Sequence, residues 1–244
     1  MARRRFFVDV VRSGRAQIAG EEAHHLSRVL RVEAGQKFEI SDNQSVYLAE
    51  VESARKDLVS FAIVGRIEAA APVVRTILLA SLIKFDRFEL MIEKATELDV
   101  EQVIPVESER SEKGLAVGAR KRLTRWNRIT REASEQSRRV RLPVIEMPAS
   151  FADALQCEAE YRYVLEEAGA PPILSVVPEV RQAEDRVALL VGAEGGWTAG
   201  EREEIEVAKW TPVSLGREIL RAETAVIAGL SIINAAWNDP RSPR

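Results

Sequence analysis

The stretch "LLVGAEGGWTAGE", Leu189–Glu201, passes from an apolar run through a glycine-rich loop to an acidic segment. The apolar run begins at Val187 and does not alternate with polar residues, which predicts a strand buried on both faces of a sheet. Three glycines follow, and they let the backbone turn sharply or approach a ligand closely: Gly192, Gly195 and Gly196. Thr198 precedes Glu201 by three residues, which is the spacing of a helix capping box. We therefore expect a strand, a tight loop and a helix, the usual place for a ligand in an open α/β sheet, although a plain glycine-rich turn fits the same residues.

A second stretch, "SLGREILRAETA" at Ser214–Ala225, repeats this order of strand end, glycine and helix start. The positive end of a helix dipole favours Glu223 but not Arg221. Arg221 therefore indicates a nearby anion, a role in a site or an ordinary surface ion pair. Neither stretch contains the G-x-G-x-x-G pattern or a Walker-type glycine loop, so a nucleotide-like cofactor bound here would not be held by a pyrophosphate group.

The composition excludes several classes of protein. The 244 residues are 46% hydrophobic and 30% charged, as in an ordinary globular protein of one large or two smaller domains. A single cysteine, Cys157, excludes a disulfide framework within the chain, and two histidines argue against a metal site. No apolar run is long enough to span a bilayer, and "MARRRFF" at the N-terminus has no apolar signal core behind it. We expect a cytoplasmic enzyme or binding protein with no metal ion and no membrane partner.

The net charge is −3, but the basic residues are clustered. Residues 1–31 hold seven basic and three acidic residues, and residues 120–141 hold nine basic and two acidic ones. Clustered positive charge binds polyanions, because each neutralised phosphate releases counterions. One basic stripe lies on the helix expected over residues 120–139: Lys121, Arg125 and Arg128. Such a stripe is often only a solvated face, but its basic continuation at residues 137–141 favours nucleic acid.

The spacing of apolar and polar residues along the sequence changes near residue 70. Before it, short alternating runs predict strands, with one helix expected over residues 20–32. The segment "EAAAPVV" that follows is typical of a linker. From residue 75 onward strand-like and helix-like segments alternate, which predicts a mostly parallel sheet covered on both faces. We expect domains at residues 1–70 and 74–244. The final helix, residues 221–237, is apolar nearly all round and must be covered by the core or by a second subunit.

The two glycine stretches together resemble the paired C-terminal motifs of the SPOUT methyltransferases. Within that superfamily the chain looks most similar to the RsmE-type 16S ribosomal RNA (uridine-N3) methyltransferases. Other stretches agree along nearly the whole length: "RRFF", "HHLSRVLRV", "KFDRFELMIEKATEL", "IPVESERS", "WNRITREASEQSRR" and "LPVI". The chain departs from the family at three positions, where Ala193 stands for the usual Pro, Trp197 for Phe and Asp99 for Gly. We expect these changes to affect cofactor affinity and not the type of reaction.

The resemblance implies a fold and a set of partners. It implies a small PUA-like β-barrel that helps to bind RNA, followed by an α/β SPOUT domain with a mostly parallel sheet and a trefoil knot. The loops of the knot would bind S-adenosylmethionine. The chain would form a homodimer with the active site at the interface, and its substrate would be 16S ribosomal RNA within the small ribosomal subunit.

This reaction also assigns roles to residues. Uracil N3 must lose its proton before it can attack a methyl group, so Arg221 would stabilise the uridinate and Glu223 would accept the proton or orient Arg221. The cofactor would contact residues from three segments of the chain: Leu165, Glu166, Gly192, Glu194, Gly195, Gly196, Ser214, Leu215, Gly216, Ile219, Leu220, Thr224 and Ala225. The RNA would contact basic residues and one histidine: Arg3, Arg4, Arg5, His25, Arg28, Arg31, Arg110, Lys121, Arg125, Arg138 and Arg139.

Other functions fit parts of the sequence. Another SPOUT branch methylates the ribose 2′-oxygen, and a non-catalytic RNA-binding factor could keep the same fold. The intact glycines and the intact "ILRAETA" stretch argue against such a loss of activity. An α/β enzyme that acts on a small metabolite would leave the two basic clusters unexplained.

Overall fold

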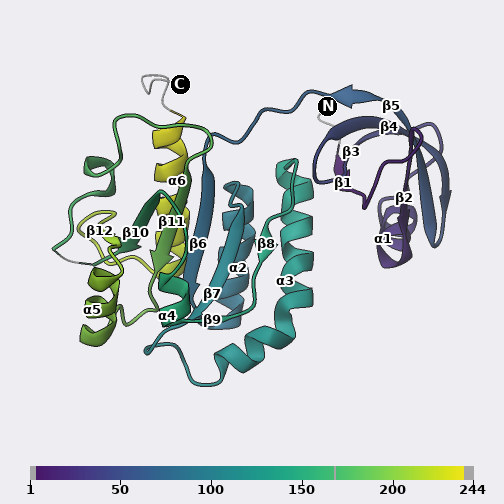
Figure 1. Ribbon diagram of the computed structural model, residues 1–244. Helices are drawn as coiled ribbons and strands as arrows, with labels where there is room; N and C mark the ends of the chain where they lie inside the picture. The colour runs from purple at the N-terminus through teal and green to yellow at the C-terminus, as the bar shows by residue number, and fades with distance from the viewer. Residues whose placement is uncertain (1–3, 168, 239–244) are drawn as a thin grey trace. The chain divides into compact units, whose positions relative to one another are not determined.

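The computed structural model describes residues 4–167 and 169–238, which form two compact units (Figure 1). The first, which we call the N-terminal unit, comprises Met1–Ala70 together with Arg131–Leu142. The second, the C-terminal unit, comprises Ala71–Thr130 together with Pro143–Arg244. The N-terminal unit thus includes a segment that follows a long stretch of the other unit in the sequence.

The N-terminal unit is built on a curled five-stranded sheet in the order β1-β3-β4-β5-β2. Its strands are β1 (Arg5–Phe7), β2 (Arg15–Ala19), β3 (Lys37–Ser41), β4 (Val46–Arg55) and β5 (Leu58–Ile67). Only the β1–β3 pair is parallel. Two register shifts between β4 and β5, at Leu48/Ala49 and Val51/Ser53, bend the sheet around its apolar core. The prediction of a β-rich N-terminal part is confirmed.

The helix expected over residues 20–32 is shorter than its apolar spacing suggests. The α-helix α1 (Gly20–His24) passes directly into a π-helix, η1 (His25–Val29). The chain leaves helical geometry at Arg31, whose φ is +50°. A π-helix adds one residue to the turn, and here the wider turn still buries Leu26 in the core.

Charged side chains hold the segment Arg131–Leu142 within the N-terminal unit. The guanidinium of Arg138 donates to Glu39 Oε1 at 2.5 Å, and that of Arg5 donates to Glu39 Oε2 at 2.9 Å. Arg5 and Glu39 are both buried, so each charge depends on its partner. Arg131 Nε also donates to Glu22 Oε1 at 2.7 Å. The basic cluster of residues 120–141 is therefore partly internal to the fold.

The C-terminal unit contains a parallel sheet in the order β12-β10-β11-β6-β7-β8, with β9 also paired to β7. Its strands are β6 (Arg75–Ser81), β7 (Gln102–Glu107), β8 (Val144–Ile145), β9 (Ala149–Ser150), β10 (Tyr161–Leu165), β11 (Arg186–Val191) and β12 (Thr211–Val213). The helices are α2 (Phe85–Glu97), α4 (Phe151–Leu155), the 3-10 helix η2 (Ile173–Ser175), α5 (Ala199–Val207), α6 (Ala222–Trp237) and the part of α3 (Leu115–Ser137) that precedes Arg131. The alternation of strands and helices is confirmed, whereas the short β8, β9 and α4 were not expected.

Strand β11 is buried on both faces, as its uninterrupted apolar run predicts. Leu189 belongs to a core shared with α2 and α6, whereas Leu190 belongs to a core shared with α4 and α5. Helix α6 lies close to the strand at Gly229, where an added Cβ would come within 2.8 Å of Leu189 Cδ2. The final helix is thus a core helix on at least one of its faces.

The fold agrees with the predicted class of a β-rich unit joined to a parallel α/β unit, while the trefoil knot stays a prediction. Within residues 4–167 and 169–238, none of the helices has both the length and the apolar character that crossing a bilayer requires. The same residues hold no group of three or more His, Cys, Asp or Glu side chains placed to ligate a metal ion.

Candidate active site

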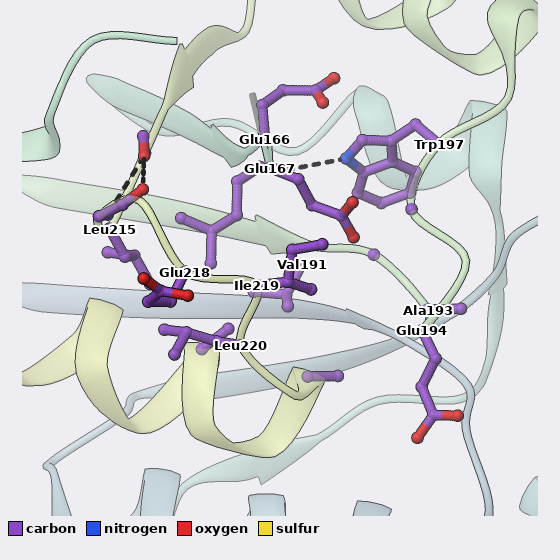
Figure 2. A pocket seen from close by; sticks show the side chains of 17 residues that line it. Glu166, Glu167, Val191, Ala193, Glu194, Trp197, Leu215, Glu218, Ile219 and Leu220 are labelled. Carbon is purple, nitrogen blue, oxygen red and sulfur yellow. Dashed lines mark hydrogen bonds between the residues drawn. The ribbon is translucent and has the colours of Figure 1, made fainter. Parts of the chain in front are cut away.

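A pocket lies at the carboxyl ends of three neighbouring parallel strands, β10, β11 and β12, and at the start of α6. Side chains from all three strand ends and from α6 surround it in Figure 2. Its lining residues are Leu165, Glu166, Glu167, Val191, Gly192, Ala193, Glu194, Gly196, Trp197, Ser214, Leu215, Gly216, Glu218, Ile219, Leu220, Ala222 and Ala225. The space in and around it that atoms do not fill is about 640 Å³, and this figure includes open solvent. Parallel α/β sheets bind their ligands at this edge.

Contacts from other parts of the C-terminal unit hold the glycine loop, Gly192–Gly196, which we call the first wall. Arg110, in the loop after β7, donates from its guanidinium to the carbonyl of Gly195. Arg87 of α2 forms an ion pair with Glu194. Within the loop, Gly196 has a φ of +67° and its N–H donates to the carbonyl of Ala193 at 2.8 Å. A side chain would strain the backbone at Gly196, so glycine is needed there for the turn.

Trp197 joins the first wall to the end of β10. Its indole Nε1 donates to the carbonyl of Leu165 at 3.0 Å, a bond drawn in Figure 2. The ring is buried and lies so near Gly192 that a Cβ there would be 3.2 Å from Trp197 Cε2. A phenylalanine, which the resemblance led us to expect at this position, could pack in the same place but could not donate the hydrogen bond.

The predicted capping box at the start of α5 is confirmed. Thr198 Oγ1 accepts from Glu201 N at 3.2 Å, and Glu201 Oε2 accepts from Thr198 N at 2.9 Å. The second oxygen of the Glu201 carboxylate accepts from the backbone N–H of Glu109 at 2.8 Å. This buried carboxylate therefore joins the helix start to the loop after β7, the same loop that carries Arg110.

The segment Ser214–Arg221, which we call the second wall, is held only at its two ends. The backbone of Ser214 bonds to Pro171 and Ile173, and its hydroxyl donates to the carbonyl of Gly216 at 2.8 Å. Between residues 217 and 220, no hydrogen bond or ion pair joins this segment to the rest of the described chain. Ile219 lines the pocket although 74% of its surface is exposed. Leu215 of the second wall packs against the core, whereas Ile219 offers apolar surface to a ligand without a core behind it.

The two predicted catalytic residues lie at the start of α6. Arg221 is the exposed residue that precedes the first turn, and Glu223 lies within that turn. Glu223 is 8% exposed, and its Oε2 has no hydrogen-bond partner among the described residues. Neither side chain lines the pocket, but Ala222 between them does. The two residues therefore flank a lining residue without lining the pocket themselves.

Most of the residues predicted to bind a cofactor line this pocket: Leu165, Glu166, Gly192, Glu194, Gly196, Ser214, Leu215, Gly216, Ile219, Leu220 and Ala225. Thr224 points to solvent, and Gly195 contributes its carbonyl to Arg110 instead of a surface to the pocket. Six lining residues were not among those predicted to bind the cofactor, although Ala193 and Trp197 had been noted as departures from the family: Glu167, Val191, Ala193, Trp197, Glu218 and Ala222. Each is a direct neighbour of a predicted residue, and all but Glu167 lie within the two glycine motifs.

The residues predicted to bind RNA have different surroundings. Arg4, His25, Arg28, Arg31 and Lys121 are exposed. Arg3 lies outside the described residues. The exposed members remain candidates for phosphate contacts in RNA.

The other predicted RNA-binding arginines have protein partners. Arg5 and Arg138 bind Glu39 in the N-terminal unit, as described above. Arg139 is buried, and its Nε donates to the carbonyl of Arg141 at 3.0 Å. Arg110 binds the Gly195 carbonyl, and Arg125 binds the Glu89 carboxylate, whose pKa is held below its usual range by Arg125 and Arg122. An RNA phosphate would have to compete with these bonds.

Comparisons with known proteins give a consistent result. A family model described as an RNA methyltransferase domain matches residues 70–234, and one described as an RNA methyltransferase PUA domain matches residues 18–64. The chain is 31% identical to the ribosomal RNA small subunit methyltransferase E of Bacillus subtilis over 89% of its length and 88% of the relative. It is also 31% identical to the protein of that name from Synechocystis, over 88% of this chain and 71% of the relative.

A solved structure is similar over almost the whole chain. It is the crystal structure of a ribosomal RNA small subunit methyltransferase E from Neisseria gonorrhoeae bound to S-adenosyl methionine. The TM-score is 0.87 at 26% sequence identity, and the match covers 96% of this chain and 98% of the other. The likeness therefore includes both units.

Proposed function

Because this chain belongs to the RNA methyltransferase family, we propose that it transfers the methyl group of S-adenosylmethionine to N3 of a uridine in 16S ribosomal RNA of the small subunit. The observation that carries the proposal is the pocket at the ends of β10, β11 and β12, with Arg221 and Glu223 on either side of its lining residue Ala222. The uridine, the N3 position and the ribosomal substrate rest on the sequence resemblance and on the names of the relatives.

The chemistry of the pocket fits this cofactor. Gly192 and Gly196 line the pocket with backbone, which can offer amide and carbonyl groups to an adenosyl group. Leu165, Ile219 and Leu220 offer apolar surface to a purine ring. Among the described lining residues there is no lysine, arginine or histidine, as expected for a cofactor without phosphate groups. When bound, S-adenosylmethionine supplies an electrophilic methyl group.

The side chains at the start of α6 would activate the uridine. The exposed guanidinium of Arg221 has no partner among the described residues, so it is available to stabilise negative charge on a uracil oxygen. Glu223 Oε2, which lacks a hydrogen-bond partner within the described chain, can accept the N3 proton or hold Arg221 in position. N3 then forms its bond to the methyl carbon while the electron pair of the broken bond stays on sulfur. The protein's part is to align the base and to stabilise its charge.

Two further parts of the proposal concern the domains of the chain and its oligomeric state. Residues 1–70 would serve as the PUA-like RNA-binding domain and residues 74–244 as the methyltransferase domain. The chain would act as a homodimer, because α6 keeps apolar side chains that do not pack on the core, such as the partly exposed Ile227 and the exposed Ala235. Light scattering coupled to size exclusion would give twice the mass of one chain if this is correct, and the mass of one chain if it is not.

The test is an assay of methyl transfer from tritiated S-adenosylmethionine. The protein is given two substrates in separate reactions, small ribosomal subunits that lack the modification and naked ribosomal RNA. Nuclease digestion and mass spectrometry would locate the methyl group. N3-methyluridine would support the proposal, and the preferred substrate would show whether assembly precedes methylation. A methyl group on a ribose oxygen would replace the proposed reaction with 2′-O-methylation. No transfer to either RNA despite measurable cofactor binding would instead indicate another substrate or a non-catalytic RNA-binding factor.

A further inference from the structure

The pocket has an excess of negative charge. Four of its lining residues are glutamates: Glu166, Glu167, Glu194 and Glu218. No basic side chain accompanies them among the described lining residues. An uncompensated carboxylate beside a partly enclosed ligand attracts positive charge more strongly than it would in open solvent. The charge felt by a ligand therefore depends on which of the four carboxylates are paired with a cation.

Two of the four carboxylates are neutralised from outside the pocket. Glu166 accepts from Arg202 of α5 at 3.0 and 3.3 Å, a bidentate pair that raises the pKa of Arg202. Glu194 forms its ion pair with Arg87 of α2. In Figure 2 both carboxylates point away from the centre of the pocket. These two glutamates therefore contribute little net charge to a ligand.

The other two carboxylates have no cation in contact with them among the described residues, although Arg202 attracts Glu167 from a longer distance than it attracts Glu166. No hydrogen bond or ion pair joins Glu167 or Glu218 to another described residue. Glu167 extends over the turn at Gly196, where an added Cβ would lie 3.6 Å from its Oε1. Glu218 belongs to the second wall. In Figure 2 the Glu167 carboxylate lies on the side of Trp197 and that of Glu218 lies on the opposite side, near Leu215, and both are nearer the middle of the view than those of Glu166 and Glu194.

We propose that Glu167 and Glu218 make the pocket selective for the positive charge of its ligand, so that it binds the methyl donor more tightly than the demethylated product. This inference rests on the proposed function. S-adenosylmethionine carries a sulfonium and an ammonium group against one carboxylate, a net charge of +1. In the proposed reaction, N3 loses its proton and bonds to the methyl carbon, and the electron pair of the broken carbon–sulfur bond stays on sulfur. The product, S-adenosylhomocysteine, therefore has no net charge. The attraction of the two carboxylates is then lost, which favours release of the product.

The test is isothermal titration calorimetry of the full chain with S-adenosylmethionine and with S-adenosylhomocysteine. It compares the wild type with E167Q, E218Q and the double variant. Glutamine keeps the size and the hydrogen-bonding oxygen but removes the charge. The control is E203Q, because Glu203 is an exposed glutamate of α5 that does not line the pocket. Thermal melting of each variant would confirm that it is folded.

We expect the wild type to prefer S-adenosylmethionine by about tenfold at low ionic strength and by less at high salt, where the charges are screened. The preference should fall toward unity in the double variant, through weaker binding of S-adenosylmethionine, and should be unchanged in E203Q. An unchanged preference in the double variant, or equal binding of both ligands by the wild type, would overturn this inference alone. If the wild type bound neither ligand, the proposed function would fail with it.

Discussion

The first wall and the second wall of the pocket share a sequence pattern of strand end, glycine and helix start, yet the structure holds them in different ways. The first wall is fixed by Arg110, by Arg87 and by the indole of Trp197, all from outside the loop itself. The second wall is anchored at Ser214 and again at the first turn of α6, and residues 216–220 between them are exposed.

The difference teaches that a glycine motif does not set the rigidity of a loop. Rigidity here depends on whether distant side chains reach the loop. Segments with few buried contacts open at low free-energy cost and are often the parts that close on ligands. We therefore expect the first wall to be formed before the cofactor binds and the second wall to become ordered around it.

The largest effect should come from Arg221, at the end of the second wall. Arg221→Ala should lower the rate of methyl transfer by about 100-fold or more, because a group that stabilises developing charge is lost. Cofactor affinity should stay within about twofold, because Arg221 does not line the pocket. Single-turnover kinetics and calorimetry would measure the two quantities. Arg217→Ala, on the same exposed segment, is the control, and full activity of Arg221→Ala would remove this residue from the mechanism.

The first wall should respond most strongly to a side chain at Gly192. Gly192→Val would place a Cβ 3.2 Å from Trp197 Cε2 and add two methyl groups beside the pocket. Such overpacking costs about 1–3 kcal/mol, so both the melting temperature and the cofactor affinity should fall. Calorimetry and thermal melting would test this against Gly200→Val in α5, where nothing lies within 4 Å of an added Cβ. Normal cofactor binding by Gly192→Val would mean that the pocket has been misplaced.

A smaller effect is expected when the bond between Trp197 and Leu165 is removed. Trp197→Phe keeps a ring in place but loses the Nε1 donor, at a cost of about 0.5–1.5 kcal/mol. Trp210→Phe is a matched control, because its buried Nε1 also donates to a carbonyl, that of Leu155, away from the pocket. Both variants should melt at lower temperature, but only Trp197→Phe should bind the cofactor more weakly. If the two variants bound the cofactor with equal affinity, this hydrogen bond would stabilise the fold but would not help to position the first wall for the cofactor.

The second wall should show a change in affinity without a change in stability. Ile219→Ser removes an apolar side chain that is 74% exposed, so the free energy of unfolding should change by no more than about 0.5 kcal/mol. The Kd for the cofactor should rise by about three- to tenfold if Ile219 covers the purine ring. Val207→Ser, at an 83% exposed position outside the pocket, should change neither quantity. A loss of stability in Ile219→Ser would contradict the view of the second wall as loosely held.

Much of this arrangement could be predicted from local sequence. The apolar run of β11 indicated burial on both faces, the Thr198–Glu201 spacing indicated a capping box, and the two glycine stretches contained most of the pocket. Each of these signals acts between residues that are close in the chain or repeat with a fixed period.

The parts that could not be predicted depend on long-range contacts. Nothing near Arg110 or Arg87 in the sequence indicates that they reach the loop at residues 194 and 195. Likewise, the basic residues at 138 and 139 looked like a free surface cluster, but the fold turns one toward Glu39 and buries the other. Charge clustering in a sequence gives the composition of a segment, and only the fold decides which charges face solvent.

The most direct test of the account is amide hydrogen exchange of the wild-type chain, followed by mass spectrometry with and without saturating S-adenosylmethionine. We predict that residues 192–198 exchange slowly in the free protein and change little on binding. Residues 214–221 should exchange rapidly in the free protein and become protected when the cofactor is bound. Rapid exchange of the first wall in the free protein, or an unprotected second wall with the cofactor bound, would contradict the division of this pocket into a preformed wall and a closing one.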